Sequence, residues 1–502
     1  ELAKDNPYAF IYNTLTSTQI SSLPLEVQPL VEKSFSTTGT IDITIYDDFK
    51  NNNSWNEYFL NTKGTAETKY KSIKYNLYPT QELNVVSGTS VSLLGYSLDN
   101  IAVADVSNNF QILSTPPLDS VGDQKTLVLL VDFLDPGERP FTREQAQEMI
   151  FGIDSPFQSF YQENSYGKVS FSGDVMGWYQ LYRTESILLD SNFIDDNYLL
   201  NIISSNNIDP APYARVVFLV NHLTGVGGYS DLGKGSYFIG GKSYSFSRIV
   251  VGRLDTAFSQ DNNYFRFNTF YGILSHEVGH ALGLPHANGW ACNSKQILYG
   301  DCRHIEYGNN YDIMGRGTSS RSLHINAFYK KRLGWIDSAS VILITQTGRY
   351  TLNPLETNSG IQLAKIQPLG STRPAYSLEY RRGIGFDIGL TDQKYLSNQN
   401  GIFVNNILPS YIDSISLLDM SPESSEWFGG LLQSATLNGQ NIFKDPIRGI
   451  TIGPIISNDD SQITFDVELE QPLCSSALPS IISISPGSVY SLAVVPGNKF
   501  RI

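Results

Sequence analysis

The sequence predicts a multidomain protein in which an α/β domain is flanked by an N-terminal β-rich domain and a C-terminal β-sandwich. The chain of 502 residues is longer than a typical single domain. Strand and helix patterns alternate only in its middle part, whereas both flanks contain short strand-like segments separated by turns. We place the N-terminal domain at 1–117, the α/β domain at 118–338 and the β-sandwich at 339–472, followed at 473–502 by a linker and the start of a further β-module.

The composition indicates a folded, acidic protein. Hydrophobic residues make up 41% and aromatic residues 12% of the chain, which is enough for several cores and excludes disorder over most of its length. The formal net charge is −14 and no cluster of Lys or Arg offsets it, so a nucleic-acid partner is not expected. No apolar run reaches the roughly 18 residues that a membrane span needs.

The N-terminal and central strands differ in the spacing of their apolar residues. Segments 40–46 and 86–94 alternate apolar and polar residues, as expected of strands with one buried face. Segments 125–133, 215–220 and 248–251 are apolar almost throughout, which predicts strands buried on both faces. Such strands are typical of a sheet that helices cover on both sides.

Helix signals occur between the central strands and stop after Trp335. Thr142, followed three residues later by Gln145, forms a capping box, and Ser155-Pro156 combines a favoured N-cap with a favoured first helical position. The later strand-like segments are 349–352, 361–366, 375–380, 402–404, 449–452 and 463–467. Clusters of Gly, Pro and Asn separate them, which predicts the β-sandwich.

Residues 275–286, with the sequence SHEVGHALGLPH, carry the clearest functional signal. A helix is predicted from about 267 to 282, with apolar residues on one face and His276, Glu277 and His280 on the other. Two histidines four residues apart lie one turn above each other and can bind the same cation. Glu277 is displaced around the helix, where its carboxylate can reach a water bound to that cation.

Gly283 is predicted to end this helix, because glycine adopts the left-handed conformation at little cost. The resulting turn can bring His286 back as a third ligand. Three imidazoles with a water in the fourth position describe an open, catalytic zinc site, in which Glu277 would deprotonate the water and pass the proton to the leaving amine. A helix with incidental core histidines is the alternative, but three of the six histidines lie within the eleven residues 276–286, which favours the metal site.

The pattern HExxHxxGxxH at 276–286 resembles that of the metzincin zinc peptidases. That clan also has a methionine-containing turn beneath the metal, and YDIMG at 311–315 matches it, with Met314 placed 28 residues after His286. The resemblance implies a twisted sheet with an active-site helix, and a supporting role for Met314. The clan often has a Tyr near the metal two residues after this methionine; Arg316 occupies that position here, so no such Tyr is implied.

Within the clan, the chain is most similar to the gametolysin-like, or autolysin-type, family. The similarity is strongest at HEVGHALGLPHAN and EYGNNYDIMGRG and extends diffusely over residues 120–470. The chain also resembles immune-inhibitor-type secreted peptidases. Those peptidases have Asp at the third-ligand position, where this chain has His286.

Other residues near the motif are weaker candidates. His222 ends a predicted strand, His304 and His324 lack ligand spacing, and Glu306 would be a ligand only in a thermolysin-like arrangement. The segment 225–233 is either the rim of a cleft that binds an extended peptide or a surface loop.

Two further patterns carry weaker signals. Asp301, Asp459 and Asp460 are candidate calcium ligands, but no EF-hand pattern surrounds them. The FSGD sequence at 171–174 is similar to an inhibitory segment of astacin propeptides, although its place after the first catalytic strand indicates coincidence.

The three cysteines bear on the compartment in which the protein works. Cys292 and Cys302 lie close together in a Gly- and Asn-rich loop, which favours a short disulfide in an oxidising compartment over two free thiols in a reducing one. Cys474 has no evident partner in the sequence. These features predict a secreted or cell-surface protein.

The sequence thus predicts a secreted zinc endopeptidase that acts on protein or peptide substrates. Its zinc ligands would be His276, His280 and His286, and its general base Glu277. Two alternatives stay open: a catalytically silent zinc scaffold that serves adhesion or binding, and a zinc hydrolase that acts on a bond other than a peptide bond. The cleavage specificity and the oligomeric state are not encoded in any motif.

Overall fold

A computed structural model describes residues 2–472 apart from 13, 29–30, 50, 52, 63–72, 84, 135–137, 182–193, 195, 222–226, 253, 255–268, 293–296, 300–301, 316–322, 392–400, 409–412 and 421–434. Within these residues the protein is mostly β-structure, arranged in three sheets with few helices. The module predicted at 473–502 lies outside the described residues.

The N-terminal part contains the predicted strands together with short helices that the sequence patterns did not predict. The helices α1 (Leu2–Asp5), α2 (Pro7–Tyr12) and α3 (Ser17–Ser21) come first. They precede β1 (Lys33–Asp48), β2 (Asn53–Thr62), β3 (Ile73–Pro79), β4 (Thr89–Leu98), β5 (Ile101–Ala104), α4 (Val106–Asn109) and β6 (Phe110–Ser114). Burial alternates along β4 and places Val91 and Leu93 in the N-terminal core, as the alternating pattern predicts.

The central part alternates strands and helices. Its elements are β7 (Gly122–Asp132), α5 (Arg143–Phe151), α6 (Pro156–Asn164), β8 (Val169–Gln180), α8 (Asp196–Ser205), β9 (Arg215–Val220), β10 (Gly228–Asp231), β11 (Gly235–Ile239), β12 (Lys242–Val251) and α9 (Thr269–Ala281). The capping box of Thr142 and Gln145 begins α5, and Ser155 caps α6 with Pro156 in its first turn. Both predicted helix starts are confirmed.

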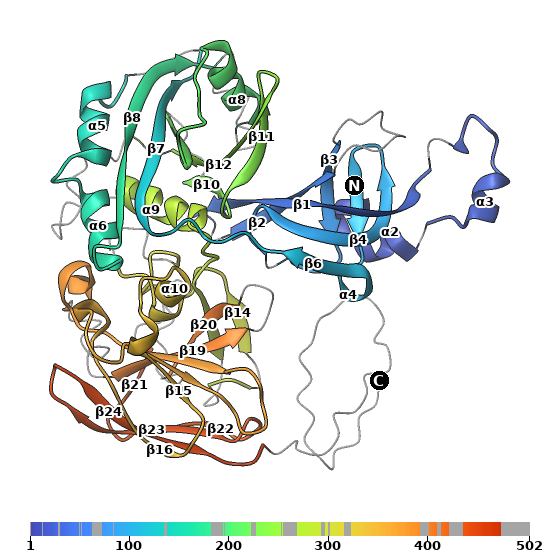
Figure 1. Cartoon of the computed structure of the whole chain (residues 1–502). Helices are drawn as coiled ribbons and strands as arrows, with labels where there is room; N and C mark the ends of the chain where they lie inside the picture. The colour runs from blue at the N-terminus through green and yellow to red at the C-terminus, as the bar shows by residue number, and fades with distance from the viewer. Residues whose placement is uncertain are drawn as a thin grey trace.

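Five central strands lie side by side in the order β10, β12, β9, β7, β8. All neighbouring pairs are parallel except β10 and β12, which are antiparallel. Side chains of β7 point alternately to the two faces: Val128 and Leu130 pack with α5, α6 and α9, whereas Leu129 packs with α8. Helices therefore cover both faces of this part of the sheet, as its continuous apolar strands predict (Figure 1).

Strand β1 extends this sheet with residues from the N-terminal part. It pairs antiparallel with β10, with Thr44 opposite Asp231 and Asp47 opposite Gly228. On the N-terminal side, β1 pairs with β2 and β4. Figure 1 shows β1 reaching from the N-terminal strands to the β10 edge near α9. One continuous sheet therefore joins the two parts of the chain.

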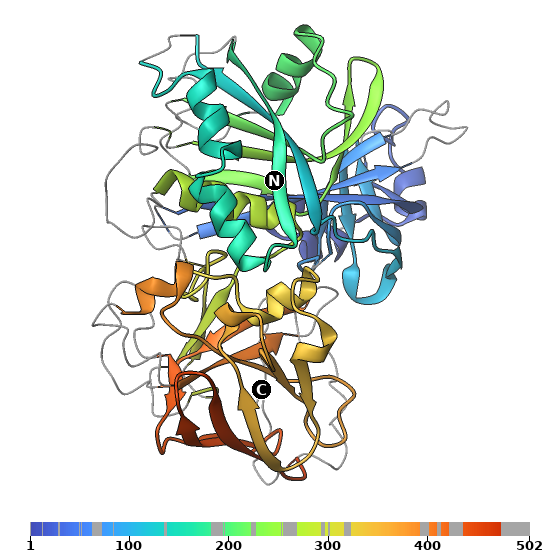
Figure 2. The ribbon, with the colours of Figure 1, turned by 60° about the vertical axis from the view of Figure 1, so that its left-hand side comes forward.

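The C-terminal part forms two further sheets, drawn below the central sheet in Figure 2. Its strands are β15 (Val341–Ile344), β16 (Gly348–Leu352), β17 (Leu363–Ile366), β18 (Tyr376–Tyr380), β19 (Gly401–Leu408), β20 (Ser414–Leu418), β21 (Thr436–Asn438), β22 (Phe443–Asp445), β23 (Ile450–Asn458) and β24 (Ile463–Leu469). Each of the six segments predicted after 339 contains a strand. Side chains of both sheets share one core, as in a sandwich.

Two strands from the segment placed in the α/β domain belong to this C-terminal sheet. These are β13 (Asn288–Cys292) and β14 (Cys302–Ile305), and β13 lies parallel to β20. Helix α10 (Ala327–Arg332) follows them, and the helices described after it are the short 3-10 turns η4 (Ser338–Ser340), η5 (Leu355–Thr357) and η6 (Gly385–Thr391). No helix in the described part of the chain is long and apolar enough to cross a membrane.

Candidate metal centre

Helix α9 carries the motif and ends where the glycine signal predicts. Gly283 has a φ of 98°, and its N–H donates to the carbonyl of His280 at 2.7 Å. The N–H of Leu284 then donates to the carbonyl of Gly279 at 3.1 Å, which completes the helix end. The chain reverses at this point, so that His286 returns to the two histidines of the helix.

The three motif histidines meet a fourth side chain, Asp47, in an enclosed cluster. Nε2 of His280 lies 3.0 Å from Nε2 of His276 and 3.1 Å from Nε2 of His286. Asp47 Oδ1 lies 2.8 Å from Nε2 of His286, and its Oδ2 lies 3.3 Å from Nε2 of His280. The four potential ligand atoms all lie within 4.8 Å of one another. This buried cluster could hold a metal ion.

Hydrogen bonds on the far side of two rings direct their Nε2 lone pairs towards each other. Nδ1 of His276 donates to the carbonyl of Ile313, and Nδ1 of His280 donates to the carbonyl of Leu284, each at 2.7 Å. Burial lowers the pKa of both histidines, so both rings are neutral and Nε2 has no proton. Two facing lone pairs at 3.0 Å repel unless a cation lies between them.

The donor set and its spacing fit zinc. Nitrogen ligands that lie about 2.0–2.1 Å from a tetrahedral ion are roughly 3.3 Å apart, close to the separations in the cluster. Imidazole is a preferred ligand of zinc, and neutral imidazoles are the form that binds metals. His276, His280 and His286, the ligands that the sequence predicts, therefore lie together in a suitable arrangement.

Glu306 orients the third histidine, a role that the sequence patterns did not indicate. Its Oε1 accepts hydrogen bonds from Nδ1 of His286 at 2.5 Å and from the hydroxyl of Ser54 at 2.9 Å. Burial alone would lower the pKa of His286, but Asp47 and Glu306 raise it to about 10. A carboxylate behind a ligand histidine fixes the tautomer and the orientation of the ring. Glu306 thus supports the cluster from outside.

Glu277 is buried beside the cluster without belonging to it. Neither of its carboxylate oxygens has a hydrogen-bond partner within the described residues. Its side chain packs against the backbone of β10 at Gly228, where an added Cβ would lie 2.5 Å from Oε1. Burial and the nearby Asp47 carboxylate raise the pKa of Glu277 well above its usual value. A carboxyl group in this setting can take up and release a proton beside the metal position.

Asp47 and Tyr307 are residues of the site that sequence reasoning missed. The hydroxyl of Tyr307 donates to Asp47 Oδ1 at 2.5 Å, and its ring centroid lies 4.4 Å from that of His286. Burial alone would raise the pKa of Asp47, but the three histidines hold it well below its usual value. The open fourth position expected from the motif is thus the place where Asp47 lies. The sequence signal was only a pair of acidic residues at the end of an alternating strand.

The turn at 311–315 supports both ligand-bearing segments. Its Ile313 carbonyl accepts the hydrogen bond from His276, and its Met314 carbonyl accepts one from the N–H of Ala287 at 2.8 Å. Met314 is fully buried and lies so close to α9 that a Cβ added to Gly279 would be 2.2 Å from its sulfur. Met314 therefore contacts the helix between the two ligand histidines.

Gly279→Ala is expected to disturb the site without altering a ligand. The added methyl group would overlap the sulfur of Met314, so either α9 or the turn must move, at a cost of about 1–3 kcal/mol. Zinc affinity and melting temperature should both fall. The double variant Gly279→Ala/Met314→Ala should be less disturbed than the two single variants combined, because the smaller side chain makes room. Strictly additive losses would contradict this explanation.

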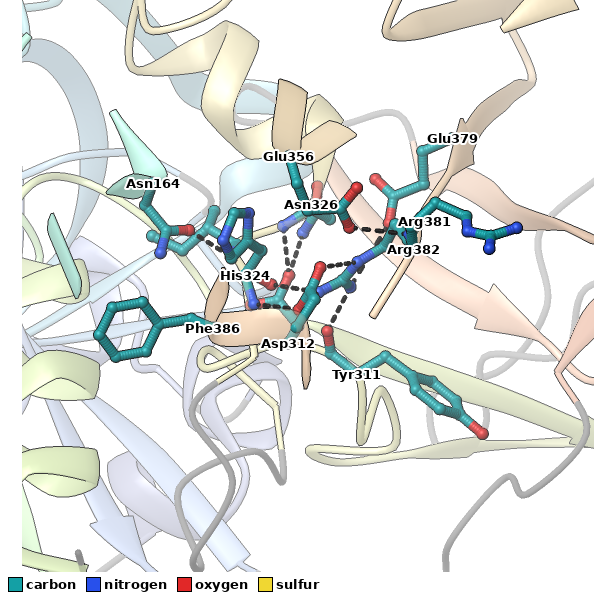
Figure 3. A network of polar contacts seen from close by, with 12 residues as sticks. Asn164, Tyr311, Asp312, His324, Asn326, Glu356, Glu379, Arg381, Arg382 and Phe386 are labelled. Atoms are coloured by element: carbon teal, nitrogen blue, oxygen red, sulfur yellow. Dashed lines mark hydrogen bonds and ion pairs between the residues drawn. The ribbon is translucent and has the colours of Figure 1, made fainter. Parts of the chain in front are cut away.

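A buried polar network holds the turn in place (Figure 3). Asp312 Oδ2 accepts hydrogen bonds from the backbone and side-chain amides of Asn326 at 2.8 and 2.5 Å. Arg381 donates to the carbonyl of Tyr311 and forms a two-point ion pair with Asp387, at 2.5 and 2.8 Å. The side chain of Arg381 is completely buried. The C-terminal part of the chain therefore fixes the turn that supports α9.

A cavity of about 1040 Å³ opens beside the cluster. Residues of all three parts of the chain line it, among them Ser54, His286, Glu306 and Leu408. His286 is 7% exposed, whereas the other members of the cluster are fully buried. The cavity therefore reaches the cluster at His286.

Several weaker candidates can be placed, and others cannot. His222, Asp301 and Arg316 lie outside the described residues. The segment 225–233 contains β10, so its described part is a strand edge rather than a loop, and β1 covers that edge. The FSGD sequence at 171–174 lies on β8 and takes no part in the cluster.

Within the described residues, the remaining histidines and acidic side chains do not form a second metal site. The exposed His304 lies 3.9 Å from the carboxylate of Glu306, and the buried His324 lies 2.7 Å from that of Glu163. Asp459 and Asp460 are exposed, and the described residues around them form no cluster suited to calcium. Across the part of the chain that the structure describes, the cluster with Asp47 is the one group of three or more His, Cys, Asp or Glu side chains suited to a metal.

The predicted disulfide is present. Cys292 and Cys302 lie opposite each other on β13 and β14, and their sulfurs are 2.03 Å apart. The bond closes the β13–β14 hairpin, which lies between His286 and the turn at 311–315. Cys474 lies outside the described residues.

A second set of carboxylates lies where β1 meets the central part. Asp42 Oδ2 accepts hydrogen bonds from the side-chain amide of Asn61 at 2.6 Å and from the N–H of Ser236 at 3.1 Å. Burial and the negative charge of Asp231 raise the pKa of Asp42 to about 6, although Lys74 acts in the opposite direction. The folded state therefore binds a proton at Asp42 more strongly than the unfolded state does.

The stability of the chain should depend on pH through Asp42. Because its folded pKa is raised, the stability is highest when it is protonated and falls as the pH rises from about 4 to 6, by about 1–3 kcal/mol. Asp42→Asn should remove this fall, so the variant should melt at a higher temperature than the native chain at pH 7 and lose that advantage at pH 4. A difference in melting temperature that is the same at both pH values would exclude Asp42 as the cause.

Comparison of the sequence with protein-family models and with curated proteins finds no significant match.

Proposed function

We propose that the chain is a zinc-dependent endopeptidase of the metzincin type, with His276, His280 and His286 as zinc ligands and Glu277 as general base. The observation that carries this proposal is the convergence of three histidine Nε2 atoms beside a buried carboxyl group without hydrogen-bond partners. Structural metal sites usually have four protein ligands and need no such carboxyl group.

Zinc bound by the three histidines would supply a Lewis acid that polarises a substrate carbonyl and makes a nearby water more acidic. The chain would supply the proton transfers. Glu277 lies next to His276 and is not tied to a donor, so its carboxylate is free to accept a proton from the attacking water. Its raised pKa suits it to hold that proton and then donate it to the leaving amine.

The arrangement of the central sheet supports a peptide as the substrate. Strand β10 is antiparallel to the other central strands and lies next to α9. Its outer edge can form main-chain hydrogen bonds with another extended segment, as the pairing with β1 demonstrates. An extended peptide bound along this edge would pass close to Glu277, which packs against Gly228 of the same strand.

The disulfide supports a location outside the reducing cytosol. Disulfides persist in secreted and cell-surface proteins and are rare where thiols are kept reduced. Together with the acidic, lightly charged composition, the bond between Cys292 and Cys302 is consistent with a secreted peptidase.

A silent metal scaffold is the second candidate, and Asp47 is the observation that favours it. Three histidines and one carboxylate make four protein ligands, which is the number found in structural zinc sites. In such a site zinc would be retained for stability, and Glu277 would have no partner and no role.

Casein digestion separates the two candidates, and the test uses the Asp47→Ala chain because this chain lacks the fourth potential ligand. A peptidase should digest casein when loaded with zinc, lose activity with a chelator and regain it when zinc is added back. His280→Ala in the same background should lose both zinc and activity, because two imidazoles bind zinc far more weakly than three. A chain that folds and binds zinc but cleaves no protein in any of these conditions would be a scaffold.

A further inference from the structure

We propose that the N-terminal part of the chain is an inhibitor of the metal centre: the β1–β2 hairpin closes the site, with Asp47 as the fourth metal ligand and β1 on the strand edge that a substrate would use. This inference rests on the proposed peptidase function and concerns its regulation.

Asp47 occupies the position that an open site would offer to water. Its two oxygens lie 2.8 Å from Nε2 of His286 and 3.3 Å from Nε2 of His280, on the side where the lone pairs converge. Oδ2 has no hydrogen-bond donor within the described residues, although it is fully buried. A buried carboxylate oxygen without a donor next to three metal-binding nitrogens has the environment of a ligand.

Asp47 also lies beside the base, Glu277. It is paired with Gly228 of β10, the residue against which Glu277 packs. Asp47 therefore lies next to the metal-binding nitrogens and next to the strand position that Glu277 contacts.

Strand β1 also occupies the strand edge that a peptide substrate would need. Four consecutive residues, from Thr44 to Asp47, pair with β10 from Asp231 back to Gly228. The opposite edge of β10 pairs with β12, so both of its edges are occupied. A peptide cannot add to β10 until β1 leaves.

The hairpin that carries Asp47 is anchored on both of its strands. Beyond β1, the ring of Phe49 packs edge-on against His276, with ring centroids 5.1 Å apart, and lies so close to Gly227 that an added Cβ would overlap it. On β2, Ser54 donates a hydrogen bond to Glu306, the carboxylate that orients His286. The inhibitory segment therefore contacts the metal-binding machinery itself as well as the surface around it.

The buried hydrogen bond from Tyr307 locks the ligand in place. Tyr307 lies on the loop between His286 and the turn at 311–315, and its hydroxyl donates to Asp47 Oδ1. It fixes the orientation of the carboxylate, so that Oδ1 faces His286. The loop after β14 thus contains a donor matched to the inhibitory carboxylate.

The visible absorption of the cobalt-substituted full chain tests the ligand assignment without measuring activity. Asp47→Ala should change the spectrum, because one ligand is replaced by solvent. Acetohydroxamate, a small metal-binding compound, should bind the cobalt of this variant at least tenfold more tightly than that of the native chain. Asp47→Asn, which keeps the side-chain shape, should shift both readouts in the same direction and guards against misfolding of the alanine variant.

Asp48→Ala is the matched control. Asp48 is the next carboxylate on the same hairpin, and it binds Asn51 rather than the cluster. Its removal should leave the cobalt spectrum and the hydroxamate affinity as in the native chain. A quenched fluorescent peptide should be cleaved at least tenfold faster by Asp47→Ala than by the native chain or by Asp48→Ala.

Three results would overturn the inference. The first is a cobalt spectrum that neither Asp47→Ala nor Asp47→Asn changes. The second is a native chain that cleaves peptide as fast as Asp47→Ala does. The third is a folded Asp47→Ala chain that no longer binds cobalt, which would make Asp47 a structural ligand. A changed spectrum and tighter hydroxamate binding without any peptide cleavage would support closure of the site by Asp47 and contradict the peptidase function instead.

Discussion

Replacing Glu277 with Gln is expected to lower peptide hydrolysis at least about a thousandfold while zinc stays bound. Gln keeps the shape of the side chain but cannot accept the proton from water or donate it to the leaving amine. The three imidazoles remain, so the zinc content should match that of the parent chain. The experiment compares Asp47→Ala with Asp47→Ala/Glu277→Gln, so that the site is open in both chains. The measurements are zinc content and initial rates on one peptide.

The control for this prediction is Glu306→Gln in the same background. Glu306 acts on His286 and does not face the proton transfers, so its loss should weaken zinc binding, and activity should return when excess zinc is supplied. Excess zinc should not rescue Glu277→Gln. Substantial turnover by Glu277→Gln with zinc bound would show that another group is the base.

Arg381→Met is expected to cost about 3–5 kcal/mol of folding free energy, the largest stability effect predicted for a single side chain. Arg381 is fully buried between Asp387 and Glu379, and its removal leaves both carboxylates in the interior without their cation. The carbonyl of Tyr311 also loses its donor, so the turn beneath α9 should loosen. Thermal and urea unfolding measure the first effect, and zinc affinity measures the second.

The neighbouring residue provides the control. Arg382 pairs with Asp460, whose side chain is 76% exposed, so Arg382→Met should cost less than about 1 kcal/mol. Equal losses for the two variants would mean that burial of the ion pair is not what makes Arg381 important.

The parts of the structure that the sequence predicted correctly depend on local signals. Thr142 with Gln145, and Ser155 with Pro156, satisfy the first N–H groups of α5 and α6, and that interaction is complete within four residues. Gly283 ends α9 for an equally local reason. The spacing of the motif histidines brought together three rings that could hold a metal ion, because a helix and one turn are enough to do so.

The parts that it missed depend on contacts between distant segments. The alternation along β1 indicates which side chains are buried, but not that Asp47 is buried against three histidines of another part of the chain. No motif marks Tyr307, because its hydrogen bond to Asp47 depends on where the folded chain places the loop that carries it. The pairing of β13 with β20 was missed for the same reason: strand patterns specify faces, whereas partners are chosen by tertiary packing.

Whether the chain is a zinc peptidase is tested by a zinc titration of the metal-stripped Asp47→Ala chain, followed by the rate of peptide hydrolysis and by mass spectrometry of the products. No cleavage is expected without metal. The rate should rise in proportion to added zinc and level off at one ion per chain, with cleavage at internal peptide bonds. Full saturation with one zinc and no cleaved peptide bond, or cleavage that is independent of zinc, would contradict the proposed function.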